Sequence, residues 1–226
     1  HLAEEFPAQI DEVLTMRDER VSGTTVERFH LLPGEDWAAM LSRLSSILGF
    51  EEDDYALEVL IEQQSYVDFF VIGSYLSPQL FEREDADGNR LQYDAQSWPP
   101  DLSRKAAPAR AERVYFSLAV PRKEVSVRGQ GQPTPVVIMG HGYTANRFDV
   151  MQSGGLFAQH GLATLAIDGP SHGLGLAELQ EALVMVEFGS EGLEPAALAL
   201  LSDRAVDLDN DGVKDSGADF WTSYLF

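Results

Sequence analysis

Two short apolar runs, each followed at once by a polar turn that contains glycine, constrain the fold of this chain most strongly. Residues 136–139 lead into the sequence HGY at 141–143, and residues 162–167 lead into DGP at 168–170. A segment of helical length, closed by Gly161, joins them. Continuous apolar runs are typical of strands covered on both faces, as in a parallel sheet. The pattern therefore predicts a strand–helix–strand unit of an α/β fold, with its chemistry at the turns that follow the strands.

The hydrophobic spacing divides the rest of the chain into three segments. Segment 1–65 is predicted to be helical, and segment 66–121 is rich in the β-branched and aromatic residues that favour strands. Segment 122–226 holds the central unit, further helices and an acidic stretch. The elements predicted outside the central unit are a helix over 36–48, strands over 66–76 and 113–120, and helices over 176–188 and 195–206.

The charge of the chain narrows the classes of partner. Its 226 residues include 37 acidic and 16 basic ones, which gives a formal charge of −21. Nucleic acids and anionic membranes are polyanions, so neither is expected to bind. The chain has no cysteine, which excludes a disulfide, a thiolate nucleophile and a cysteine-ligated zinc. No apolar run is long enough for a transmembrane helix.

The two turns carry a resemblance to a known family. The sequence HGY after a predicted buried strand, followed one helix and one strand later by DGPSHG at 168–173, resembles the α/β-hydrolase superfamily. The run-up over 114–140 is similar to that of secreted bacterial lipase-like and esterase-like proteins. The resemblance implies an α/β-hydrolase-like fold, with a mostly parallel sheet flanked by helices and preceded by a helical and β-rich N-terminal region. It also implies an extracellular, periplasmic or cell-surface location.

The resemblance assigns roles to the first turn. In the family, the backbone N–H of the residue after His-Gly helps to form the oxyanion hole, and that residue is Tyr143 here. Gly142 would permit the tight turn, and His141 would brace the loop. A preorganised donor of this kind lowers the barrier to acyl transfer by about 3–4 kcal/mol. The implied activity is hydrolysis of a small-molecule or lipid carboxylic ester. The helices over 176–188 and 195–206 are either a lid or plain packing helices.

One part of the expected machinery is missing from the sequence. The family places a serine in a Gly-x-Ser-x-Gly turn after the oxyanion loop, and no such motif occurs here. The histidines that follow Tyr143, at 160 and 172, come too early in the chain for a catalytic triad. We expect the nucleophile to lie further along a longer protein or on a second polypeptide that carries the C-terminal half of the fold. This chain alone is then expected to be inactive.

An acidic stretch near the end resembles a calcium loop. Carboxylates alternate along 207–215, with a glycine among them, and Ca²⁺ takes six to eight oxygen ligands from such turns. Position twelve of an EF-hand is Ala218, where a glutamate belongs, so the shorter extracellular form fits better. A solvated acidic loop is the alternative interpretation. The predicted calcium ligands are Asp207, Asp209, Asp211, Val213 through its carbonyl, and Asp215.

Three functions follow from these observations. The first is a lipase-like or esterase-like serine hydrolase that needs residues outside this chain. The second is a calcium-binding extracellular module with a non-catalytic hydrolase-like fold. The third is a different α/β enzyme that uses His141, Asp168 and His172 directly, with those three residues as possible metal ligands, although their spacing matches no common ligand pattern.

Overall fold

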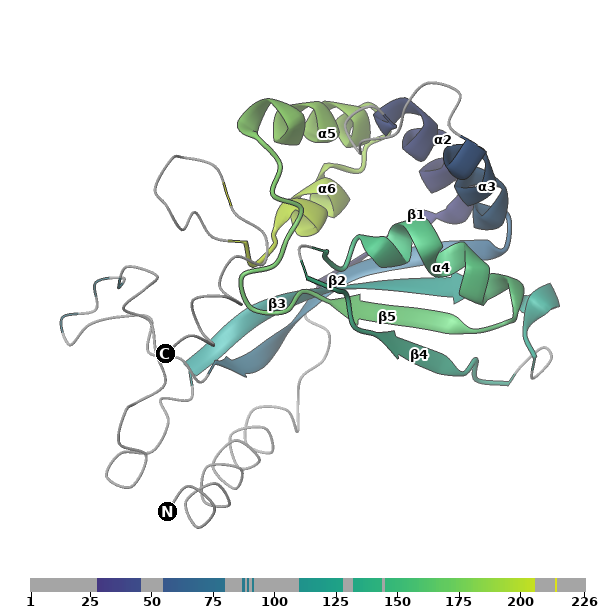
Figure 1. The fold of residues 1–226 in the computed structure, drawn as a ribbon, viewed down its shortest axis with the longest axis horizontal. Coiled ribbons are helices and arrows are strands. Elements are labelled where there is room, and N and C mark those ends of the chain that lie inside the picture. Colours follow the sequence, from purple (N-terminus) through teal and green to yellow (C-terminus); the bar gives the residue numbers. More distant parts are fainter. Residues whose placement is uncertain are drawn as a thin grey trace, which may run out of the picture.

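The computed structural model describes residues 28–45, 55–79, 87, 89, 91, 110–127, 132–143, 145–205 and 214. Within these residues the chain forms one five-stranded sheet with helices against it, an α/β fold (Figure 1). The strands are β1 (Arg28–Pro33), β2 (Val67–Gln79), β3 (Arg110–Pro121), β4 (Val136–Met139) and β5 (Ala163–Ile167). The helices are α2 (Gly34–Leu44), α3 (Tyr55–Gln64), the short 3₁₀ helix η2 (Lys123–Val125), α4 (Asp149–Gln159), α5 (Glu178–Ser190) and α6 (Glu194–Leu201).

The sheet is mixed rather than mostly parallel. Its strand order is β1-β2-β3-β5-β4, and the pairs β1–β2, β2–β3 and β3–β5 are antiparallel. Only β4 and β5 run parallel among the described strands, because helix α4 carries the chain back between them. The prediction of a mostly parallel sheet is therefore wrong for the part of the chain that the structure covers. The predicted strand–helix–strand unit is present as β4, α4 and β5.

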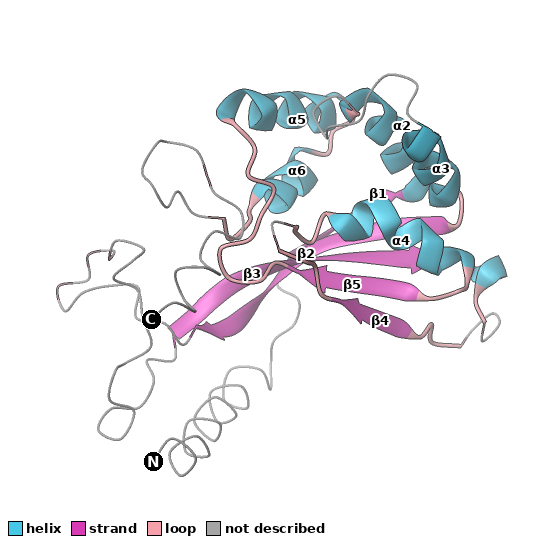
Figure 2. Cartoon of the chain, in the orientation of Figure 1, coloured by secondary structure: helices cyan, strands magenta, loops and turns pink. Residues whose placement is uncertain are grey.

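The helices lie on one face of the sheet (Figures 1 and 2). Trp37 of α2 is fully buried there, where its indole meets Phe70 and Phe148 edge-on at centroid distances of 6.3 and 5.4 Å. Its Nε1–H donates to the Met151 carbonyl at 2.7 Å, so the polar group of this buried ring is satisfied. This core joins α2, α4 and the long strand β2 into one body.

The opposite face of β4 is open in the described structure. Val136 is 55% exposed and Ile138 is 78% exposed, whereas Met139 packs against the core on the helix side. Ile167 at the end of β5 is exposed on the same face as Ile138, in line with their register. The prediction that the apolar run 136–139 is covered on both faces is therefore not met by the described residues.

Most predicted elements occur close to their expected positions. The strand predicted over 66–76 runs further, to Gln79, and passes through Pro78, where it was expected to stop. Segment 1–65, predicted to be helical, contains the strand β1, which pairs with β2 in the same sheet as the later strands. Segments 66–121 and 122–226 also contribute to this one sheet.

Candidate functional site

The turns after β4 and β5 lie side by side and are joined by a histidine. The Gly169 N–H donates to His141 Nε2 at 2.8 Å, and His141 Nδ1 lies 3.0 Å from the Gly142 carbonyl. A backbone N–H only donates and a carbonyl only accepts, so this pattern assigns a neutral imidazole with its proton on Nδ1. His141 thus holds the HGY turn to the turn that begins at Asp168.

A second histidine packs against the first. The rings of His141 and His172 are 4.6 Å apart at an angle of 43°, and His172 Nδ1 lies 2.8 Å from the Pro170 carbonyl. Between them in the chain, Ser171 is buried with φ of +56°, a left-handed conformation that favours glycine.

Gly142 and Tyr143 lie at the surface of the described structure. A Cβ added at Gly142 would meet no described atom within 4 Å, and the Tyr143 side chain is 52% exposed. Gly142 also accepts a hydrogen bond from the Ala145 N–H at 3.2 Å, which closes the turn. The predicted site residues 141–143 are thus together at the carboxyl end of β4, and Gly142 faces open space.

A buried ion pair that the sequence did not reveal joins the residue before α4 to the turn after β5. Arg147 and Asp168 are 2% and 1% exposed, and the Arg147 guanidinium is paired with the Asp168 carboxylate. The Arg147 backbone N–H donates to the same carboxylate at 2.7 Å. The only sequence signal was a basic residue in a turn between two apolar segments of an acidic chain.

The same guanidinium also caps helix α6. Arg147 Nη2 donates to the carbonyls of Ala199 and Leu200 at 2.7 and 2.8 Å, and Nη1 donates to that of Ser202 at 3.2 Å. These groups belong to the last turn of α6, where unpaired carbonyls and the negative end of the helix dipole favour a cation. Burial lowers the pKa of Arg147, while the negative charges of Asp168 and Asp203 oppose that shift.

The residues after α6 also bind the turn after β5 and the segment that follows that turn. Arg204 donates to the Asp168 carbonyl at 3.1 Å and to Glu112 at 2.8 Å, and Asp203 accepts the Leu174 N–H at 2.9 Å. Burial raises the pKa of Asp203, and the nearby Lys214 ammonium opposes that shift. Burial likewise raises the pKa of Asp149 at the start of α4. The end of α6 and the turn after β5 therefore form one unit.

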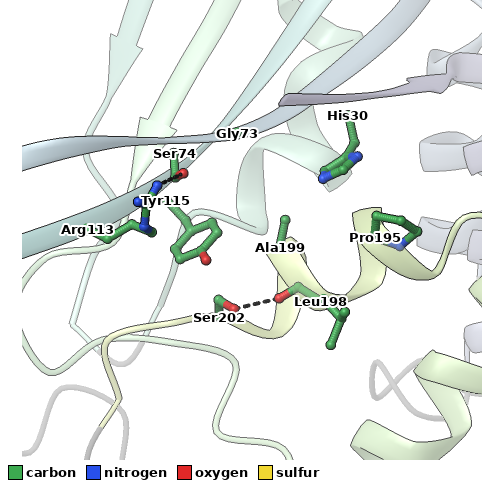
Figure 3. Close-up of a pocket in the computed structure, with 9 residues that line it drawn as sticks. All are labelled: His30, Gly73, Ser74, Arg113, Tyr115, Pro195, Leu198, Ala199 and Ser202. Carbon is green, nitrogen blue, oxygen red and sulfur yellow. Dashed lines mark hydrogen bonds between the residues drawn. The ribbon is translucent and has the colours of Figure 1, made fainter. Parts of the chain in front are cut away.

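A pocket of about 280 Å³ opens next to this unit, between α6 and the strands β1 to β3 (Figure 3). Local sequence patterns did not predict this pocket, because its walls come from four elements far apart in the chain. Residues 141–143 do not line it. Its lining residues are His30, Gly73, Ser74, Arg113, Tyr115, Pro195, Leu198, Ala199 and Ser202.

The structure bears differently on the two metal sites that were predicted from the sequence. The predicted calcium ligands Asp207, Asp209, Asp211, Val213 and Asp215 lie outside the described residues. Within the described ranges, no group of three or more acidic or histidine side chains has the geometry of a metal site. This includes His141, Asp168 and His172, because the Asp168 carboxylate is bound by Arg147.

Helix α5 presents apolar side chains to the outside. Leu179, Leu183 and Val186 recur at helical spacing and are exposed, whereas Val184 and Phe188 are buried against the core. The sequence left open whether this helix is a lid or a packing helix, and the described structure shows both kinds of face. No helix among the described residues has the length and apolar character to cross a membrane.

No family model, no curated protein and no solved structure matches this chain. The relationship to α/β-hydrolases therefore stays a prediction, and it rests on the motifs at 141–143 and 168–173.

Proposed function

We propose that this chain forms the oxyanion-loop half of a lipase-like or esterase-like carboxylic ester hydrolase. The observation that carries the proposal is the joining of the HGY turn to the turn after β5 by the Gly169 N–H to His141 hydrogen bond. In this proposal the Tyr143 N–H stabilises the oxyanion of the tetrahedral intermediate, and His141 positions the loop. Gly142 leaves open the space in which the substrate carbonyl would lie.

The proposed mechanism assigns no proton transfer to His141. Its Nε2 accepts the Gly169 N–H and its Nδ1 faces the Gly142 carbonyl, so both ring nitrogens hold the loops. A general base must have a free lone pair directed at the proton that it removes. The serine nucleophile, its base and the acid would then come from residues outside this chain, as the missing Gly-x-Ser-x-Gly motif requires.

The open side of β4 supports a partner that completes the fold. β4 is the last strand in the described sheet, and Val136 and Ile138 expose their apolar side chains on its uncovered face. Exposed apolar patches and unpaired strand edges mark surfaces that bind further chain. We propose that the C-terminal half of a hydrolase fold, on the same longer protein or on a second polypeptide, covers this surface. An extracellular, periplasmic or cell-surface location is part of the same proposal.

The decisive experiment removes one backbone N–H. In the assembled hydrolase, replacing Tyr143 with its α-hydroxy acid analogue keeps the side chain and converts the amide N–H to an ester oxygen. We expect kcat for a p-nitrophenyl ester to fall by roughly 10²–10³ with little change in KM, as for loss of other oxyanion donors. Tyr143→Phe retains the N–H and should keep most of the activity. Unchanged kcat in the α-hydroxy acid variant, or ester turnover by this chain alone, would contradict the proposal.

Calcium is a separate proposal that rests on the acidic pattern at 207–215. If the ion binds only the native state, it stabilises that state according to RT ln(1 + [L]/Kd). At a free concentration about 100 times Kd, this amounts to about 2.7 kcal/mol. We therefore expect chelation to lower the melting temperature, and we expect Asp209→Asn to reduce that effect. A melting temperature that chelator and added Ca²⁺ leave unchanged would argue against a structural ion.

A further inference from the structure

Helix α5 has apolar side chains on two opposite sides, and the core covers one of them. Val184 and Phe188 are buried against the core. On the other side, Leu179, Leu183 and Val186 are 72%, 45% and 69% exposed. Their spacings of four and three residues place them in a row along the helix, which we call the α5 stripe. A surface helix normally turns polar side chains to the solvent, so this row has the character of a surface that another molecule covers.

The rest of the helix holds the α5 stripe in a fixed position. The Arg43 guanidinium of α2 pairs with the carboxylates of Glu187 and Glu191, which ties the end of α5 to its neighbour. At the start of the helix, the Ala177 N–H donates to Gln180 Oε1 at 2.9 Å. Because α5 is anchored at both ends as well as in the core, a partner would not have to order it on binding.

The segment that carries the α5 stripe is strongly acidic. Residues 178–201, which include α5 and α6, contain five glutamates and no lysine, arginine or histidine. In the described structure, Arg43 pairs with two of these glutamates and Lys214 with Glu181, at 3.3 Å. Lys214 also lies 3.7 Å from the carboxylate of Asp203. These carboxylates outnumber the two cations, so the surroundings of the stripe keep a net negative charge.

Glutamates lie on both sides of the α5 stripe. Glu187 follows Leu183 by four residues and is therefore its neighbour on the helix surface. On the other side, a Cβ at Gly189 would lie 3.5 Å from Glu194 Cγ, and Gly189 follows Val186 by three residues. An apolar row between carboxylates is complementary to an apolar row between cations.

We propose that the α5 stripe docks a basic amphipathic helix of a partner protein, with apolar residues at matching spacing and lysine or arginine on both flanks. Rows of side chains on two helices interlock, and such helices are recognised through apolar anchors at these spacings. A second copy of the chain would bring two sets of glutamates together, and an anionic membrane would meet a chain of charge −21.

This docking surface is separate from the open face of β4. Figure 1 shows α5 at the top of the molecule and β4 at the bottom, with α4 and the other strands between them. The inference therefore goes beyond the proposed ester hydrolysis and does not depend on it. Binding at α5 is measured on the chain as it stands, without turnover.

The first test uses three labelled peptides of about 18 residues, long enough to form a helix. The first peptide has leucines on one helical face and lysines on its flanks, the second scrambles the same residues, and the third has glutamates in place of the lysines. Fluorescence anisotropy measures their binding to the unmodified chain. We expect the first peptide to bind at least about tenfold more tightly than the other two, and to bind more weakly as salt increases. Equal binding of the scrambled or the glutamate peptide, or no saturable binding of the first, would overturn the proposal.

Matched variants then locate the site. Leu183→Gln places a polar group in the α5 stripe, and Leu156→Gln is its control, because Leu156 is also a helical leucine with 45% exposure but lies on α4. Leu183→Gln should weaken binding of the first peptide at least about tenfold, and Leu156→Gln should change it less than about twofold. Glu194→Gln should reduce the salt dependence of binding, whereas Glu62→Gln on α3 should not. Equal effects of the two leucine variants would overturn the assignment to α5.

Two further measurements address the other possible occupants of the α5 stripe. Sedimentation of the chain alone reports self-association, and flotation with phosphatidylcholine vesicles reports lipid binding. We expect Leu183→Gln to leave both results the same as for the unmodified chain. Self-association or vesicle binding that Leu183→Gln abolishes would assign the stripe to a second copy or to lipid instead, and would contradict the proposal.

Discussion

At the level of single residues, Arg147 has the largest structural role near the candidate site. Its guanidinium pairs with Asp168 and donates to three carbonyls at the end of α6, while its own backbone N–H binds the same carboxylate. Moving two charges out of water is costly, and the pair repays this cost only because almost all its polar groups are bonded. Removing one partner leaves the other charge buried and unpaired.

We therefore predict that Arg147→Met lowers the free energy of unfolding by about 3–5 kcal/mol, the usual cost of breaking a buried pair. Arg43 is the matched control, because it pairs with Glu187 and Glu191 at the surface. Arg43→Met should cost less than about 1 kcal/mol. Urea denaturation followed by circular dichroism measures both values. A cost for Arg147→Met no greater than that for Arg43→Met would show that the buried pair does not stabilise the fold.

At the level of secondary structure elements, helix α4 is shaped by its two central glycines. A Cβ at Gly154 would come within 2.6 Å of the Ala119 Cβ of β3, and one at Gly155 would come within 2.5 Å of the Gln63 carbonyl of α3. Real Cβ atoms do not approach other atoms so closely, so the glycines allow α4 to lie against its neighbours. By helix propensity alone, two central glycines would only weaken the helix.

This packing reverses the usual effect of a glycine-to-alanine change. In an ordinary helix interior, alanine is more stable than glycine by about 1 kcal/mol. We predict that Gly155→Ala instead lowers the free energy of unfolding by about 1–3 kcal/mol, because the backbone of α3 must shift to make room. In α5, a Cβ at Gly189 would lie 3.5 Å from its nearest described neighbour, the Glu194 Cγ atom.

Gly189→Ala is therefore the control for helix propensity without a clash. We expect it to be neutral or to stabilise the chain by up to about 1 kcal/mol. Thermal melts of the two variants provide the comparison. If both alanines stabilise the chain equally, the close approach of α4 to α3 is not a constraint on the fold.

The elements also show what a sequence can reveal and what it cannot. The apolar runs at 136–139 and 162–167 predicted where β4 and β5 lie in the chain, because local hydrophobic spacing follows backbone geometry. The Arg147–Asp168 pair and the pocket at Arg113 depend on contacts between elements far apart in the chain, so no local pattern encodes them. The mixed sheet was missed for the same reason, since strand direction depends on how distant segments pair.

At the level of the whole molecule, the described structure is asymmetric about its sheet. Helices cover one face of the sheet (Figure 2). On the other face, at β4, Val136 and Ile138 expose apolar side chains. Apolar side chains that stay exposed to water do not contribute to the free energy of unfolding through the hydrophobic effect. They become favourable when another layer of protein removes them from water, at about 25 cal/mol per Å² of apolar surface. We therefore propose that another layer of protein binds this face.

This view leads to a prediction about Val136→Glu combined with Ile138→Glu. In the chain alone, the double variant should change the free energy of unfolding by less than about 0.5 kcal/mol, as expected at exposed positions. If the proposed hydrolase assembles on this face, the two carboxylates would be buried without partners, so we expect loss of assembly and of ester turnover. Val127→Glu is the control, because Val127 is also exposed but lies before β4. Denaturation of the chain and size-exclusion chromatography of the assembly measure the two effects. A cost above about 2 kcal/mol in the chain alone, comparable to that of a core change, would mean that this chain already covers the face itself.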